Sequence, residues 1–204
     1  MRNVLAIGAH PDDIELGCGG TLIKHVASGD TVTMLVVTKG EVGPGLTSAR
    51  ISEQERAQHI IGAHELVWGD LPDCKVSLHE LQLVHIIENL IKRIRPSVIY
   101  THSQQDSHQD HRAVALGTFG AARQCSNILT YDAPSSMHFT PNVFVDVTST
   151  LDKKIEALQC HASQVAASEM VNAERVRNTA GYRGHEARCG AAEAFASIRF
   201  VFDV

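Results

Sequence analysis

The sequence lacks the features that define several large classes of protein. No stretch approaches the roughly 20 consecutive apolar residues that a membrane-spanning helix requires, so we expect no membrane span. The 18 Lys and Arg residues are scattered along the chain and are outnumbered by 23 Asp and Glu, which leaves a net charge of -5. A nucleic-acid partner requires clustered basic residues, and we therefore expect none.

Cysteine pairs are also missing. The five cysteines are an odd number and contain no C-x-x-C spacing, which is typical of reduced thiols rather than of a disulfide framework. Met1-Arg2-Asn3 leads directly into an apolar strand, without the apolar segment and cleavage site of a signal peptide. We therefore expect a cytoplasmic protein. With 204 residues and 44% hydrophobic content the chain can bury a full core, which predicts a single domain over residues 1–204.

Short apolar runs alternate with segments of helical period along the chain. The apolar runs predict strands at 4–8, 31–38, 65–68, 98–101, 128–131 and 143–147. The periodic segments predict helices at 17–28, 49–61, 78–95, 108–123 and 148–160, with a further helix at 193–197 and a final strand at 198–202. Such alternation indicates an α/β protein, with a mainly parallel twisted sheet and helices on both faces.

Two polar clusters follow the first and the fourth predicted strand. The stretch Ala9-His10-Pro11-Asp12-Asp13 comes directly after an apolar run, and His108-Gln109-Asp110-His111 lies about a hundred residues later. In a doubly wound sheet whose first three strands grow in one direction, the fourth strand lies on the other side of the first. The loops after these two strands then meet at the carboxyl edge, so we expect both clusters to line one crevice.

The two clusters together contain the ligands of a catalytic metal site. His10 and Asp13 reach one cation from a single tight turn, and His111 completes a set of three ligands. A fourth position is then open for water, as in catalytic zinc sites. A bound metal ion lowers the pKa of such a water to roughly 7. The sequence therefore predicts a metal-dependent hydrolase.

The remaining polar residues of the clusters are candidates for proton transfer and substrate binding. We expect Asp12 to act as general base, and His108 to polarise a carbonyl group and to protonate a leaving amine. Asp110 is suited to holding one imidazole in its tautomer. Arg50 either forms a surface pair with Glu53, three residues later, or binds a substrate oxygen at the same edge of the sheet.

Other segments have simpler interpretations. The glycines of Gly17-Cys18-Gly19-Gly20 favour close packing of the first helix over ligand binding. His161, Ser163 and Gln164 are most simply polar residues at a helix end. Arg183-Gly184-His185 predicts a glycine-rich turn that either folds over the pocket or forms an ordinary surface loop.

The string A-H-P-D-D-x-E-x-G-x-G-G, at residues 9–20, resembles the opening motif of the PIG-L/LmbE-like deacetylases. The resemblance continues in family order over nearly the whole chain. It includes R-x-x-E at 50–53, H-x-D-H at 108–111, L-x-x-H-x-S-Q at 158–164 and A-E-A-F at 192–195.

The resemblance implies a Rossmann-like fold and a zinc hydrolase that removes N-acyl groups, typically acetyl, from N-acetylglucosamine-type sugars or their conjugates. The zinc ligands of the family fall on His10, Asp13 and His111, with iron(II) as an alternative ion in vivo. The general base falls on Asp12, the oxyanion or acid histidine on His108 with Asp110 orienting, and Arg50 falls among the substrate contacts.

Several alternatives stay open at this point. The same residues would serve an amidase that cleaves a larger acyl or thiol conjugate. Two histidines and one carboxylate are also the ligands of non-heme iron oxygenases, although the second carboxylate, Asp12, argues against that class. A third alternative is a non-catalytic metal- or sugar-binding module. A monomer, a dimer and a hexamer are all compatible with the sequence.

Overall fold

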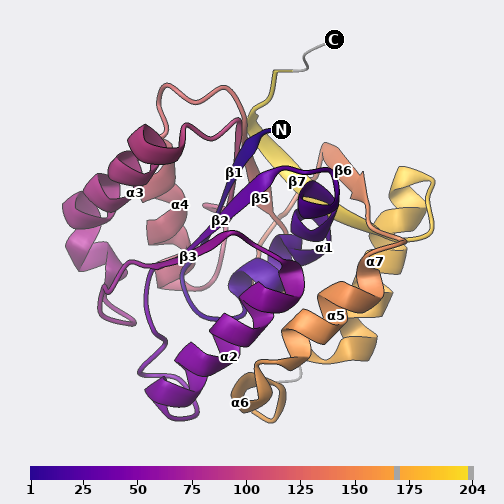
Figure 1. Ribbon diagram of the computed structural model, residues 1–204, viewed down its shortest axis with the longest axis horizontal. Helices are drawn as coiled ribbons and strands as arrows, with labels where there is room; N and C mark the ends of the chain where they lie inside the picture. The colour runs from indigo at the N-terminus through magenta and orange to yellow at the C-terminus, as the bar shows by residue number, and fades with distance from the viewer. Residues whose placement is uncertain (168–170, 202–204) are drawn as a thin grey trace.

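The computed structural model describes residues 1–167 and 171–201. Seven strands form one sheet in the order β3-β2-β1-β4-β5-β7-β6 (Figure 1). The strands are β1 (Asn3–Gly8), β2 (Thr31–Val36), β3 (Glu65–Trp68), β4 (Val98–Thr101), β5 (Ile128–Tyr131), β6 (Val143–Asp146) and β7 (Ala192–Arg199). The first five are parallel to one another, and β7 is antiparallel to both of its neighbours, β5 and β6. The predicted α/β fold with a mainly parallel sheet is confirmed.

Helices cover both faces of the sheet. They are α1 (Asp13–Ala27), α2 (Thr47–Ile61), α3 (Glu80–Ile94), α4 (Gln109–Ala121), α5 (Leu151–Gln159), α6 (Ala162–Val165) and α7 (Ala173–Ala187), with a 3-10 turn at Val76–His79. In Figure 1, α3 and α4 lie on one side of the sheet, and α1, α2 and α5 lie on the other. Among the described residues, none of the helices has the length and hydrophobicity needed to cross a lipid bilayer.

The central strand β1 contributes to the core on both faces. Val4 and Ala6 pack into the apolar cluster beneath α1 and α2, whereas Leu5 and Ile7 pack into the cluster beneath α3 and α4. A strand buried on both sides reads as a continuous apolar run rather than an alternating one. This explains why the run from residue 4 to residue 8 is uninterrupted.

The predicted change of direction in the sheet is confirmed. β1 pairs in parallel with β2 on one side and with β4 on the other. The loops that leave the carboxyl ends of β1 and β4 are therefore neighbours. Such a point in an open α/β sheet is the usual place for a ligand crevice.

The first helix begins earlier than predicted and contains a break. It starts at Asp13 rather than Gly17, and Cys18 interrupts it with a non-helical φ of -146°. The carboxylate of Glu193 accepts hydrogen bonds from the N–H groups of Gly20 (2.8 Å) and Thr21 (2.7 Å), which caps the second half of the helix. A Cβ added to Gly17 would lie 2.3 Å from the ring of Tyr131, so the predicted packing role of this glycine is confirmed.

Three predictions for the last part of the chain are wrong. Residues 193–197 lie in strand β7, not in a helix, because they pair with β5 and β6. The predicted final strand at 198–202 is only the end of β7, and residue 202 lies outside the described residues. The predicted turn at Arg183-Gly184-His185 lies inside α7, whose buried stripe consists of Val176, Ala180 and Gly184. Small residues at this spacing give only a weak helical pattern, and the glycines favoured the incorrect prediction of a turn.

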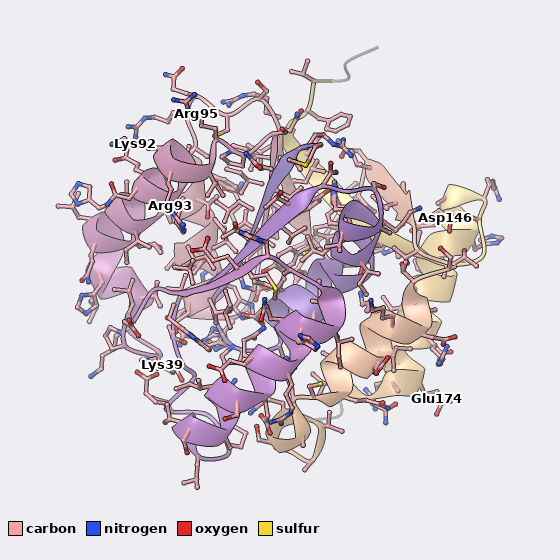
Figure 2. All side chains as sticks on the ribbon, viewed as in Figure 1. Lys39, Lys92, Arg93, Arg95, Asp146 and Glu174 are labelled. Carbon is pink, nitrogen blue, oxygen red and sulfur yellow. The ribbon has the colours of Figure 1, made fainter. Side chains whose placement is uncertain are left out.

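Charged side chains lie on the outside of this arrangement. The residues labelled in Figure 2, among them Lys92, Arg95 and Glu174, project away from the sheet. Lys92 and Arg93 stand in the last turn of α3, where cations interact favourably with the helix dipole. The surface pair between Arg93 and Glu65 links α3 to the edge strand β3 at 2.8 Å.

Candidate active site

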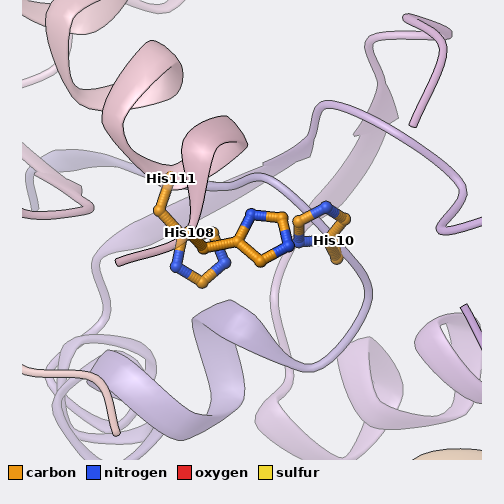
Figure 3. A group of neighbouring side chains, drawn as sticks. All are labelled: His10, His108 and His111. Carbon is orange, nitrogen blue, oxygen red and sulfur yellow. The ribbon is translucent and has the colours of Figure 1, made fainter. Parts of the chain in front are cut away.

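The two predicted clusters meet in one pocket at the carboxyl edge of β1 and β4. His10 comes from the loop after β1, whereas His108 and His111 come from the start of α4, and Figure 3 shows the three imidazoles facing one another. The ring centroids of His10 and His108 are 4.7 Å apart, and those of His108 and His111 are 4.6 Å apart. The pocket has a volume of about 320 Å³, and its wall also contains Asp12, Asp13 and Arg50.

Asp13 lies between the two imidazoles with which it is predicted to share a metal ion. Its Oδ1 is 3.3 Å from Nε2 of His111, and its Oδ2 is 3.4 Å from Nδ1 of His10. The Oδ2 atom also accepts the backbone N–H of His10 at 2.7 Å. Burial by itself would raise the pKa of Asp13, but the imidazoles of His111 and His102 hold it well below its usual value.

The outer nitrogens of the same imidazoles contact further carboxylates. Nε2 of His10 is 3.1 Å from Asp73 and 3.4 Å from Asp110, and Nδ1 of His111 is 3.2 Å from Asp106. Burial would lower the pKa of His10, yet its hydrogen bonds to Asp110, Asp13 and Asp73 raise it well above the usual value. Asp13 and Asp106 likewise outweigh burial and raise the pKa of His111 to about 9.

These contacts fit the chemistry of a divalent-cation site. In metalloproteins a ligating histidine typically presents one nitrogen to the metal and donates the other N–H to a carboxylate or carbonyl. His10 and His111 both have this arrangement, with Asp13 on the inner side. Ligand atoms of His10, His108 and His111 lie within 4.8 Å of one another, and so do those of Asp13, His102 and His111. Two imidazoles with a carboxylate suit zinc or iron(II) better than magnesium or calcium.

Asp12 adopts a strained backbone conformation beside this cluster. Its φ is +96°, in the left-handed region that residues with a side chain rarely occupy. It is the N-cap of α1, but its side chain makes no capping hydrogen bond, and its N–H donates to Oε1 of Gln54 at 3.3 Å. Burial, with Asp13 adding to the effect, raises the pKa of Asp12 to about 7. A carboxylate with such a pKa is suited to proton transfer near neutral pH.

His108 is oriented by the helix that it begins. It is the N-cap of α4, and its Nδ1 accepts the backbone N–H of Asp110 at 3.2 Å. A neutral imidazole that accepts at Nδ1 carries its proton on Nε2. Burial, followed by the neighbouring His10 and His111, lowers the pKa of His108. The ring is therefore a neutral hydrogen-bond donor at Nε2.

Asp110 contacts His10 and the loop after β3. Besides its contact with His10, its carboxylate accepts the backbone N–H groups of Cys74 (2.7 Å) and Val76 (3.3 Å). The imidazole that faces this carboxylate is thus that of His10, while His108 uses only the backbone N–H of Asp110.

Arg50 and Glu53 are both buried, with 4% and 5% exposure, so the surface-pair interpretation is wrong. Arg50 donates to the carbonyl oxygens of Gly40 (2.6 Å) and Pro11 (3.3 Å), and within residues 1–167 and 171–201 its Nε has no hydrogen-bond partner. Glu53 instead accepts from the N–H and the hydroxyl of Ser163.

The sequence analysis missed three residues of this cluster: His102, Asp106 and Asp73. His102 is fully buried immediately after β4, with Nε2 3.1 Å from Asp13. A histidine directly after a buried strand at the change of direction, with a carboxylate four residues later, is a pattern that could have identified His102 and Asp106. Asp73 lies in the loop after β3, and no local pattern distinguishes it.

Comparison with known proteins gives consistent matches. Residues 5–122 match the family described as PIG-L, GlcNAc-PI de-N-acetylase. The Escherichia coli protein YaiS, described as an uncharacterized deacetylase, is 36% identical over 169 residues, covering 79% of this chain and 91% of YaiS. The diacetylchitobiose deacetylase of Thermococcus kodakarensis is 27% identical, covering 80% of this chain and 70% of that enzyme. The crystal structure of the conserved protein TT1542 from Thermus thermophilus has a TM-score of 0.90 at 26% identity and covers 100% of this chain and 98% of that one.

One relative is named for a reaction of another class. The 4-oxalmesaconate hydratase of Pseudomonas putida is 23% identical, covering 80% of this chain and 74% of that enzyme. Proteins similar to this chain are thus named both as deacetylases and as a hydratase. Since one fold supports several reactions, the reaction of this chain has to be inferred from the residues of its pocket.

Proposed function

The chain belongs to the PIG-L family of GlcNAc-PI de-N-acetylases, and from this membership we propose that it hydrolyses the N-acetyl group of an N-acetylglucosamine-type amino sugar or its conjugate. In this proposal His10, Asp13 and His111 hold a zinc ion, with iron(II) as the alternative. When bound, the ion supplies Lewis acidity, which lowers the pKa of a coordinated water to roughly 7. The cytoplasmic location and the single domain over residues 1–204 stay predictions.

The observation that supports this proposal most is that one pocket contains a set of metal ligands, a candidate base (Asp12) and a neutral hydrogen-bond donor (His108). Asp12, whose pKa is raised to about 7, accepts the proton of the attacking water. His108 donates its Nε2 proton as a hydrogen bond to the amide oxygen, where negative charge develops during attack. The expected protonation of the leaving amine by His108 is revised, because its imidazole is neutral: we assign this proton to Asp12, which receives it from the water. Asp110 keeps Nε2 of His10 occupied, so that Nδ1 is the nitrogen that faces the ligand position.

Arg50 is proposed to bind a substrate oxygen. Its two Nη atoms hold the loop after β2 against Pro11, and its Nε is left for another acceptor in the pocket wall. Loss of Arg50 should therefore raise KM and also loosen the loop that forms one rim of the pocket.

A second cavity supports a conjugated substrate rather than a free monosaccharide. This cavity of about 660 Å³ shares Leu16, Ala133 and Pro134 with the metal pocket. Its other walls combine small apolar residues such as Ala192 with polar and charged side chains, among them Thr179, Lys154 and Glu193. A pocket of about 320 Å³ beside it suits one sugar with its acetyl group, so we place the second unit of the substrate in the larger cavity. The alternative substrate, a larger acyl or thiol conjugate, would occupy the same space.

The direct test measures the release of free amine from a panel of substrates by the purified protein. The panel contains N-acetylglucosamine, diacetylchitobiose, other N-acetylglucosaminides and N-acylated thiol conjugates, each with zinc, with iron(II) and with a chelator. We expect metal-dependent amine release that the chelator abolishes and added metal restores. Hydration of an unsaturated dicarboxylate without any amine release would instead favour the hydratase class. Reductant-dependent oxygen consumption would favour an oxygenase, and binding of sugar without turnover would favour a binding module.

A further inference from the structure

A buried histidine outside the proposed mechanism lies close to Asp12. His161 stands just before α6 and is 0% exposed, and neither of its ring nitrogens has a hydrogen-bond partner among the described residues. The segment that carries His161 is fixed in place, because Ser163, two residues later, donates hydrogen bonds from its N–H (2.9 Å) and its hydroxyl (2.6 Å) to the carboxylate of Glu53. A buried polar side chain without partners is costly, so an apolar residue would be expected here unless the imidazole has a role.

The group that His161 faces is the buried carboxylate of Glu15. This residue of α1 is also 0% exposed. Its Oε1 accepts a hydrogen bond from Nε2 of Gln54 at 2.6 Å, whereas its Oε2 has no hydrogen bond to any residue that the structure describes and lies 3.6 Å from Nε2 of His161. A buried negative charge has to be offset by a nearby basic group. In the described part of the chain, His161 is the basic side chain that faces this oxygen.

The electrostatic environment of His161 agrees with this pairing. Burial by itself lowers the pKa of the imidazole, but Glu15, then Asp12 and Glu53, raise it above its usual value. These carboxylates come from α1, from the turn before α1 and from α2, so His161 stands among acidic groups of three neighbouring segments.

Glu15 in turn determines how Gln54 is oriented. Gln54 is 0% exposed on α2 and contacts Glu15 with one end of its amide and the N–H of Asp12 with the other. A carboxylate can only accept hydrogen bonds, so the amide has to present its NH2 group to Glu15. Its oxygen is then directed to the N–H of Asp12, at 3.3 Å.

Asp12 depends on such support because its own conformation is strained. Its φ of +96° is unfavourable for a residue with a side chain, and its carboxylate does not cap α1. Residues in this region of the Ramachandran plot persist only where surrounding contacts over-determine them. The Gln54 oxygen is the side-chain acceptor that holds the Asp12 amide.

We propose that His161 is a positioning residue that acts through Glu15 and Gln54 to hold Asp12 in its strained conformation in the wall of the metal pocket. The proposal rests on the proposed function only in taking Asp12 as the general base. It assigns to the string L-x-x-H-x-S-Q a role beyond that of polar residues at a helix end.

The first experiment does not depend on activity. Crystal structures of the metal-free full-length protein are compared for the wild type, His161→Leu, which is apolar and of similar size, and His161→Gln, which keeps a donor. In His161→Leu we expect Gln54 to rotate, the contact between its Oε1 and the Asp12 N–H to be lost, and the φ of Asp12 to leave the left-handed region. In His161→Gln these features should be retained. An unchanged Asp12 and Gln54 in His161→Leu would overturn the proposal.

The second experiment measures kinetics and metal binding on the same variants. We expect His161→Leu to lower kcat about 10- to 100-fold, the usual range for a residue that orients a functional group, with KM and zinc affinity within about twofold of wild type. His161→Gln should recover most of kcat. In an Asp12→Asn background, His161→Leu should cause no further loss, because residues that act through one another are not additive. A full further loss in that background would contradict the proposal.

The matched control is His25→Asn on the same helix as Glu15. His25 is half-buried and also faces a carboxylate, Asp30 at 2.8 Å, but it lies at the other end of α1. It should change neither kcat nor the conformation of Asp12. If the wild-type protein releases no amine from any substrate, the proposed function fails, and the crystal structures still decide the role of His161.

Discussion

His102 and His111 stack with their ring centroids 3.9 Å apart, and both present Nε2 to the carboxylate of Asp13. His102 is fully buried, and burial lowers its pKa to about 4, with His111 adding to the shift. Its Nε2 also lies 3.1 Å from the backbone nitrogen of Ala9, and the contact with Asp13 requires that this Nε2 carries the ring proton. One imidazole of the stack is thus a candidate metal ligand, while the other ties the candidate carboxylate ligand to the end of β4.

From this relationship we expect His102 to support metal affinity without being a ligand. His102→Gln should weaken zinc binding about 10- to 100-fold, the usual cost of losing a residue that orients a ligand. Competition with a chromophoric chelator measures the affinity. His25→Asn serves as control and should bind zinc as the wild type does. Equal affinities of His102→Gln and wild type would show that Asp13 needs no such support.

Substitutions of Asp12 and of His10 should impair the protein in different ways, the first through turnover and the second through metal affinity. Asp12→Asn should lower turnover by at least ~100-fold while metal remains bound, since it removes the general base. His10→Ala should reduce metal affinity itself. Metal content by atomic absorption, measured beside kcat, separates the two effects. Normal turnover by Asp12→Asn would show that the base is assigned to the wrong residue.

Metal binding should release protons at neutral pH. Folding raises the pKa of His111 to about 9 and that of His10 well above its usual value, so both imidazoles hold a proton in the metal-free protein. A metal ion displaces these protons, and its affinity should therefore fall as the pH is lowered. Calorimetric titrations in buffers of different ionisation enthalpy count the released protons, for which we expect about one to two. Binding without proton release would contradict the protonated state of the cluster.

The same pKa shift predicts the pH dependence of stability for the metal-free protein. A group whose pKa is raised by folding stabilises the folded state in its protonated form. The contribution of His111 is therefore fully present below its unfolded pKa, near 6.5, and is lost as the pH rises through about 9. Thermal unfolding of the metal-free protein between pH 6 and pH 10 should show this decline, and His111→Gln should reduce it.

The buried pair of Lys154 and Glu193 should contribute to the stability of the folded chain. Nζ of Lys154 contacts Glu193 at 2.6 Å, and the same carboxylate caps the second half of α1. Glu193→Ala leaves a buried cation without its partner, which typically costs about 3–5 kcal/mol of the free energy of unfolding. Chemical denaturation measures the change. Arg93→Ala, which breaks the exposed pair with Glu65, is the control and should have little effect.

The proposed role of the second cavity can be tested with a substitution in α7 that fills the cavity with a large side chain. Thr179→Trp places a large side chain in its wall, whereas Arg177→Trp changes a residue of the same helix that does not line it. We expect Thr179→Trp to raise KM for diacetylchitobiose at least about tenfold, with KM for N-acetylglucosamine unchanged. Equal effects on both substrates would place the second unit elsewhere.

Most of the parallel half of the sheet could be predicted from local patterns. The run around Val4 is buried on both faces, and helical spacing around Leu83 and Ile87 identifies α3. The last third was harder to predict. The helix α7 has few large apolar residues, and β7 is identified only by its pairing with β5 and β6.

The order of apolar runs along the chain, together with the rule for the change of direction in doubly wound sheets, was enough to bring His10 and His111 to one edge of the sheet. The sequence by itself thus determined the fold class and the meeting of the two motifs, because periodicity and short connections are local properties. Only the tertiary structure decided which carboxylate faces which imidazole. Asp73 and His161 come from segments far away along the chain, and their proximity to the pocket results from how the loops and helices pack, which no local pattern encodes.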